Sequence, residues 1–133
     1  MAQLPPALPV YIVEDDEAMR DSLALLLELD GFEVHSFVSA AAFVAALELG
    51  RAGERDSFLI LDVTLPGMSG IELLHRHRER LGDRRVVMMS GHAGPSEKAR
   101  ALALGARAFL DKPFAEEDLL AALGQAASGA TRH

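Results

Sequence analysis

Five short runs rich in apolar residues are spaced along the chain, and the stretches between them carry leucine and alanine at intervals of three or four residues. Short apolar runs are typical of strands in a sheet, and the second spacing is typical of amphipathic helices. The runs are Leu8–Val13, Phe32–Phe37, Phe58–Leu61, Arg85–Met89 and Ala106–Leu110. This alternation of strand and helix predicts a five-stranded parallel sheet with helices on both faces, a doubly wound α/β fold.

Local signals indicate where several elements begin and end. Phe32–Phe37 alternates apolar and polar residues, so it is predicted to be an edge strand. Ser39 is placed to cap the second helix, and Gly31 is placed to end the first. The third helix is predicted to be continuous from Ser69 to Leu81. The five predicted helices span about residues 17–30, 40–50, 69–81, 96–104 and 115–127.

Composition narrows the class of protein. A length of 133 residues, 50% of them hydrophobic, predicts one domain with a packed core. The net charge of −7 argues against a surface for nucleic acid or anionic membrane, which needs a basic patch. The chain has no cysteine, which excludes disulfides and cysteine-bound zinc and fits a reducing compartment. The first residues do not resemble a signal peptide and no apolar run is long enough to span a membrane, so we expect a cytoplasmic protein.

Polar residues follow four of the predicted strands at the ends that a parallel sheet brings to one edge. They are, in chain order, Glu14, Asp15, Asp16, Asp62, Ser90 and Lys112. Ligands of open α/β sheets bind outside the carboxyl ends of the strands. We therefore expect these carboxylates, the hydroxyl and the ammonium group to share one shallow pocket.

Crowded carboxylates repel one another, and a divalent cation would relieve the repulsion. Ligands that are all oxygen favour Mg²⁺, with Mn²⁺ or Ca²⁺ as alternatives. Phosphoryl transfer depends on such placement of charge, so Asp62 is the candidate nucleophile. Each group alone also has a simpler explanation, because Glu14–Glu17 would complement a helix dipole, Ser90 would serve in a turn and Lys112 would be a solvated charge.

Several motifs occur in an order that is similar to one family. They are Val13-Glu14-Asp15-Asp16, Leu61–Gly70, Met89-Ser90-Gly91-His92, Leu104-Gly105-Ala106 and Asp111-Lys112-Pro113-Phe114. With them the chain resembles the receiver domains of two-component response regulators over residues 9–127, and Ser-Gly-His resembles receivers of the nitrogen-fixation regulator type. The resemblance implies a (βα)5 flavodoxin-like fold with strand order 2-1-3-4-5. Residues 1–8 would be an N-terminal extension and 128–133 a flexible tail.

The resemblance assigns a role to each residue that would touch the phosphoryl group. Asp62 would accept that group from the phosphohistidine of a cognate histidine kinase. Ser90 would donate a hydrogen bond to the bound group, and Lys112 would form an ion pair with it. The bend at Pro66 and Gly67 is expected to leave the Asp62 carboxylate exposed.

The resemblance also implies how Mg²⁺, or Mn²⁺ in its place, would be held. The ligands would be Asp15, Asp62, the backbone carbonyl of Thr64 and, mostly through water, Glu14. Glu14 and Asp15 form the acidic pair if Arg20 sets the register. If the register slips by one residue, the pair is Asp15 and Asp16.

A two-state switch follows from these roles. The phosphoryl group adds about −1.5 to −2 charges, which would draw Ser90 and Lys112 inward. Phe109, three residues before the lysine, would turn into the space that Ser90 vacates. The face formed by the fourth helix, the fifth strand and the last helix would then change shape. That face would serve a downstream output domain or partner protein, or a phosphorylation-dependent homodimer.

The expected function is therefore that of a phosphoacceptor domain, which is not an enzyme beyond assisting its own phosphorylation and autodephosphorylation. Direct contact of this domain with nucleic acid or membrane is not expected. One alternative is an interaction module that keeps the fold without using the site. A second is a Mg²⁺-dependent phosphatase with an aspartyl-phosphate intermediate, but that class of enzyme needs an aspartate two residues after the nucleophile, where this chain has Thr64.

Overall fold

The computed structural model describes residues 8–50 and 56–129, and within them the strands form one parallel sheet. The strand order is β2-β1-β3-β4-β5, which confirms the predicted topology and the place of β2 at an edge. The strands are β1 (Pro9–Val13), β2 (Glu33–Phe37), β3 (Phe58–Asp62), β4 (Arg85–Ser90) and β5 (Ala106–Asp111). Because every strand runs in the same direction, all five carboxyl ends lie at one edge.

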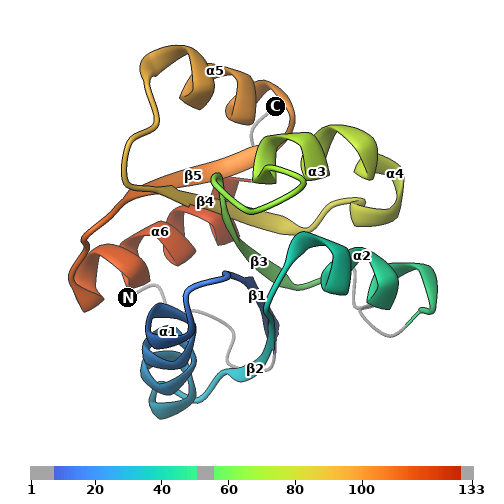
Figure 1. Cartoon of the computed structure of the whole chain (residues 1–133). Helices are drawn as coiled ribbons and strands as arrows, with labels where there is room; N and C mark the ends of the chain where they lie inside the picture. The colour runs from blue at the N-terminus through green and yellow to red at the C-terminus, as the bar shows by residue number, and fades with distance from the viewer. Residues whose placement is uncertain (1–7, 51–55, 130–133) are drawn as a thin grey trace.

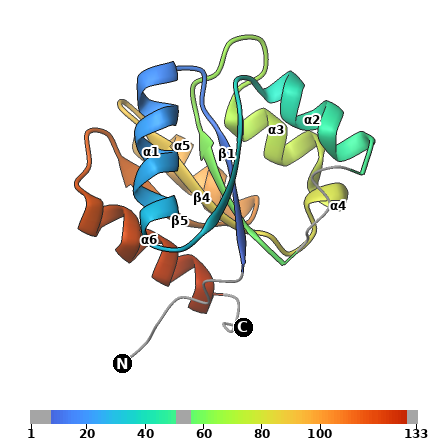
Figure 2. The same cartoon turned by 90° about the horizontal axis from the view of Figure 1, so that it is seen from below.

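The helices of the described residues cover both faces of the sheet (Figure 1, Figure 2). They are α1 (Glu17–Leu29), α2 (Ala40–Glu48), α3 (Gly70–Arg76), α4 (Arg78–Leu81), α5 (Pro95–Ala103) and α6 (Glu116–Gly129). The helices α1 and α6 pack on one face, and α2, α3, α4 and α5 pack on the other. Ser39 Oγ accepts a hydrogen bond from the Ala42 amide at 3.0 Å, which confirms the predicted cap.

Alternation along the buried strands divides the core into two layers. In β3, Leu59 and Leu61 face α2, α3 and α5, whereas Phe58 and Ile60 face α1 and α6. All four of these side chains are inaccessible to solvent. The strands are therefore apolar at successive positions because helices cover both faces of the sheet.

The prediction of one helix from Ser69 to Leu81 was wrong. The helix stops at Arg76, His77 adopts φ −118° and ψ 28°, and a second short helix begins at Arg78. Ser69 is the N-cap, and its Oγ accepts from the Glu72 amide at 3.1 Å. The break leaves Leu81 buried at the end of α4.

The last helix continues through Ser128 to Gly129, which is beyond its predicted end. The predicted extension over residues 1–8 lies outside the described residues except for Leu8, and so does the predicted tail from residue 130 onward. Among the described residues, no helix is both long enough and apolar enough to span a membrane.

Candidate functional site

Asp62 is the last residue of the central strand β3, and the chain around it is fixed by backbone hydrogen bonds. The Val63 amide donates to the Met89 carbonyl at 2.9 Å, and the Gly70 amide donates to the Val63 carbonyl at 2.8 Å. Gly70 packs so closely that a β-carbon there would lie 2.3 Å from the Asp62 carbonyl oxygen. The loop after β3 therefore closes tightly against the strand end.

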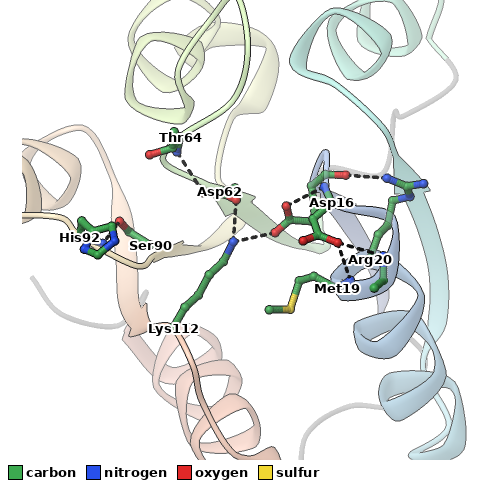
Figure 3. Close-up of polar contacts among 10 residues, drawn as sticks. Asp16, Met19, Arg20, Asp62, Thr64, Ser90, His92 and Lys112 are labelled. Atoms are coloured by element: carbon green, nitrogen blue, oxygen red, sulfur yellow. Dashed lines mark hydrogen bonds and ion pairs between the residues drawn. The ribbon is translucent and has the colours of Figure 1, made fainter.

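The Asp62 carboxylate is buried, so the prediction that the bend leaves it exposed was wrong. Its side chain is only 5% exposed, and each carboxylate oxygen accepts a hydrogen bond. The Thr64 amide donates to Oδ1 at 2.9 Å, and Lys112 Nζ donates to Oδ2 at 2.7 Å. The Lys112 side chain extends from beyond the end of β5 to the Asp62 carboxylate, as Figure 3 shows.

Lys112 joins two carboxylates that are far apart in the sequence. Its Nζ also lies 2.9 Å from Glu14 Oε1, and its backbone amide donates to the Ser90 carbonyl at 2.8 Å. The second bond continues the β4–β5 ladder by one residue and carries the lysine over the carboxyl edge. The ammonium group therefore sits between Glu14 and Asp62.

The acidic residues after β1 have two different roles. Carboxylate oxygens of Glu14, Asp15 and Asp62 all lie within 4.8 Å of one another. Asp16 instead is the N-cap of α1, and its Oδ1 accepts from the amides of Ala18 and Met19 at 3.0 and 3.2 Å. The structure thus groups the pair Glu14–Asp15 with Asp62 and leaves Asp16 as a helix cap.

Burial and hydrogen bonding shift the pKa values of Glu14 and Lys112 in opposite directions. Burial raises the pKa of Glu14, although hydrogen bonds from the Asp16 amide and from Lys112 oppose the rise. Burial alone would lower the pKa of Lys112, but its bonds to Asp62 and Glu14 together raise it. The lysine therefore stays charged at neutral pH, while Glu14 ionises less readily than a solvated glutamate.

The cluster has the chemistry of a site for a hard divalent cation. Three carboxylates and one ammonium group leave an excess of negative charge at the edge of the sheet. Every ligand atom within the cluster is a carboxylate oxygen, which suits Mg²⁺ or Mn²⁺ better than zinc. Glu14, Asp15 and Asp62 are the residues that fit such an ion.

Ser90 and Phe109 lie on neighbouring strands beside this cluster. Ser90 is buried at the end of β4, and its Oγ accepts from the His92 amide at 3.1 Å. Phe109 is half-buried on β5 and packs against the core beneath α2, α3 and α5. Lys98 Nζ of α5 lies 5.3 Å from the centre of its ring. Phe109 therefore lies between the core and Lys98 of α5.

Arg20 and Gly70 position the site through contacts that were not expected from the sequence. Arg20 Nη1 donates to the Glu14 carbonyl at 2.8 Å, and so holds the acidic segment from one turn into α1. Gly70 is needed because the backbone of Asp62 lies where its side chain would be. The spacing of Arg20 from Glu14 is visible in the sequence, but the close approach at Gly70 requires the folded loop.

Together, the parallel sheet, the buried strand-end aspartate and the bridging lysine define a class of signalling domains. The model of the response regulator receiver domain family matches residues 10–124. The chain belongs to this family, whose members are signalling phosphoacceptors and not classical enzymes.

Known proteins of this family share both sequence and fold with the chain. The transcriptional regulatory protein FixJ of Azorhizobium caulinodans is 40% identical over 121 residues, covering 90% of this chain and 55% of the relative. The crystal structure of FixJ-N superposes with a TM-score of 0.78 at 31% identity, covering 95% and 96% of the two chains. Chemotaxis protein CheY4 of Vibrio cholerae superposes with a TM-score of 0.78 at 27% identity, covering 90% and 98%. The chain thus spans about half the length of the curated relatives it matches.

Proposed function

We propose that Asp62 is the phosphoacceptor of a two-component system and that a histidine kinase is its phosphodonor. The observation that carries the proposal is the buried Asp62 carboxylate, which Lys112 Nζ contacts at 2.7 Å within a cluster of three carboxylates. An isolated strand-end aspartate would serve as a turn or cap, as Asp16 does. A turn or cap does not need Lys112 across the Asp62 carboxylate or the carboxylates of Glu14 and Asp15 beside it.

In the proposed reaction, a carboxylate oxygen of Asp62 forms a bond to phosphorus. The bond between phosphorus and the imidazole nitrogen of a phosphohistidine breaks, and that nitrogen keeps the electron pair and takes up a proton. Both oxygens of Asp62 already accept hydrogen bonds, from Thr64 and from Lys112. The oxygen that forms the bond to phosphorus uses its second lone pair, because the first already accepts one of these hydrogen bonds.

Glu14, Asp15, Asp62 and the Thr64 carbonyl would hold Mg²⁺, or Mn²⁺ in its place. When bound, the ion neutralises charge on the phosphoryl oxygens. The remaining positive charge comes from Lys112, which would transfer from the Glu14 and Asp62 carboxylates to the phosphoryl group. The Ser90 hydroxyl would move away from the His92 amide and donate a hydrogen bond to a phosphoryl oxygen.

The proposed output is a change in the face formed by α5, β5 and α6. Movement of Ser90 would open space into which Phe109 turns, and Lys98 would follow because it lies over the Phe109 ring. Leu102 of α5 is 51% exposed beside this strand and would contact a partner or a second copy. The output would then be a cytoplasmic partner protein, an output domain or a phosphorylation-dependent homodimer, without direct contact of this domain with nucleic acid.

Beryllofluoride with Mg²⁺ provides the test, because it imitates a phosphoryl group on an aspartate. Amide signals of Asp62, Ser90 and Lys112 are expected to shift in the wild-type protein and not in Asp62→Asn. The variant Asp16→Asn, in the helix cap, is the matched control and is expected to retain the response. An unchanged wild-type spectrum would favour the alternative of an interaction module that does not use the site.

A further inference from the structure

A second charged surface runs over α5, α3 and α4, with α3 in the middle. A cavity of about 730 Å³ separates α3 from α5, and another of about 340 Å³ lies at the junction of α3 and α4. His75 and Arg76 line both cavities, so the two are neighbours. We call this surface the basic strip and define it by His75, Arg76, Arg78, Arg80 and Arg100. Figure 1 shows the three helices on the same side of the molecule.

Three arginines of the basic strip have no partner within the described residues. Arg78, Arg80 and Arg100 are exposed, and none of their side chains forms a hydrogen bond, ion pair or ring contact there. Every other lysine or arginine of the described residues holds at least one such contact. In a chain with 20 acidic and 13 basic residues, these three arginine side chains are available to a partner outside the chain.

The acidic residues beside the strip neutralise only part of its charge. Glu72 is paired with Arg76 at 2.7 Å, and Glu97 Oε1 accepts from the Gly94 amide at 3.2 Å. Glu79 is the one acidic residue in the lining of the smaller cavity. The linings of the two cavities together hold four arginines against three glutamates, so the strip keeps a small excess of positive charge on a chain whose net charge is −7.

We propose that the basic strip is a docking surface for an acidic segment of a partner protein. Guanidinium groups bind carboxylates through two parallel hydrogen bonds, and Arg78, Arg80 and Arg100 are available for that pairing. The larger cavity also has the apolar side chains of Val63 and Leu65 in its lining. A segment that alternates acidic and apolar side chains satisfies both features.

A nucleic acid fits this surface less well than an acidic protein segment. The strip is flanked by Glu72 and Glu97, and the rest of the chain is strongly acidic, so a long polyanion would be repelled. A short segment meets fewer carboxylates of the chain than a long polyanion does, so the repulsion is smaller. The arginines carry their charge whether or not Asp62 is phosphorylated, so binding is tested with the unphosphorylated protein.

The experiment uses three probes with the ¹⁵N-labelled protein. The first is a short synthetic peptide in which glutamate alternates with leucine, the second has glutamine at each glutamate, and the third is a single-stranded DNA oligonucleotide. We expect the glutamate peptide to shift amide signals within residues 75–80 and 96–100, and to bind less tightly as salt is added. The glutamine peptide and the DNA are expected to bind much more weakly.

Variants on one helix provide the matched comparison. Arg100→Gln is expected to weaken peptide binding roughly two- to fivefold, whereas Lys98→Gln, with the same charge change on α5, leaves it unchanged. The triple variant Arg78→Gln/Arg80→Gln/Arg100→Gln is expected to bind the peptide roughly tenfold more weakly, or worse. Lysine at the same three positions keeps the charge without the guanidinium group, and is expected to recover part of that affinity. Absence of peptide binding, signal shifts elsewhere, or equal weakening by Lys98→Gln would overturn the proposal. Tighter binding of DNA than of peptide would overturn the choice of partner.

Discussion

The acidic cluster at the carboxyl edge and the basic strip on α3, α4 and α5 hold their charges in opposite ways. Asp62 and Glu14 are almost inaccessible to solvent, and each accepts hydrogen bonds from Lys112 and the backbone. Arg78, Arg80 and Arg100 are exposed and have no partner within the described residues. A buried charge must be compensated by the fold itself, whereas an exposed charge is solvated and remains available to a partner.

The tightest part of the acidic region is the approach of Gly70 to Asp62. We expect Gly70→Ala to lower the free energy of unfolding by about 3 kcal/mol, since its new β-carbon would overlap the Asp62 carbonyl oxygen. Urea denaturation measures the loss. The control is Gly124→Ala in α6, where a β-carbon meets no atom within 4 Å, and a gain of up to about 1 kcal/mol is expected. Equal effects at both positions would show that Asp62 is not closely packed.

The next largest effect is expected from Lys112, which compensates two buried carboxylates. Lys112→Gln is expected to cost about 2 kcal/mol of stability without metal, because Glu14 and Asp62 would lose their ion pair. Added Mg²⁺ would restore part of the loss. Lys98→Gln is the control, since its pair with Asp111 is partly exposed and is worth less than about 1 kcal/mol. A smaller loss at Lys112 than at Lys98 would contradict the contrast between buried and exposed charge.

A smaller, pH-dependent effect is expected at Glu14. Burial raises its pKa above the value of 4.5 for a free side chain, so the folded state binds this proton more tightly than the unfolded state. Without metal, wild-type stability should therefore fall relative to Glu14→Gln as pH rises from about 4.5 through the raised pKa. Denaturation at a series of pH values measures this difference, with Asp21→Asn as an exposed control. A difference that grows in the opposite direction would mean that Glu14 is stabilised as a carboxylate.

The smallest effect is expected in the basic strip. Arg78→Gln/Arg80→Gln should change the free energy of unfolding by less than about 0.5 kcal/mol, because neither side chain has a partner to lose. The same double variant is expected to weaken binding of the acidic peptide. Thermal denaturation beside the peptide titration separates the two effects. A stability loss similar to that of Lys112→Gln would show that these arginines hold the fold together.

Much of this fold could be predicted because its signals are local and repeated. The buried strands are continuous apolar runs, and Gly31, with φ +95°, follows the end of α1 as expected. The break at His77 could not be predicted, since neither glycine nor proline marks it. Helical spacing alone places Leu74 and Leu81 on one face of a continuous helix.

The sequence predicts which residues lie at the candidate site but not how they are arranged. Parallel strand order brings Glu14, Asp62 and Lys112 to one edge, and each lies there. The sequence does not indicate that Lys112 lies between the two carboxylates or that Asp62 is buried, because both depend on the path of the chain after β5. The fold is also needed to see that Asp16 caps α1, whereas Glu14 and Asp15 lie near Asp62.

The central claim is that Asp62 accepts a phosphoryl group, and intact-mass measurement after incubation with acetyl phosphate and Mg²⁺ tests it most directly. The wild-type protein is expected to gain the mass of one phosphoryl group and to lose it on further incubation. Asp62→Asn, shown by circular dichroism to be folded, is expected to gain nothing, and the helix-cap variant Asp16→Asn to behave as wild type. An unmodified wild-type protein, or an equal gain in Asp62→Asn, would contradict the assignment of Asp62 as the phosphoacceptor.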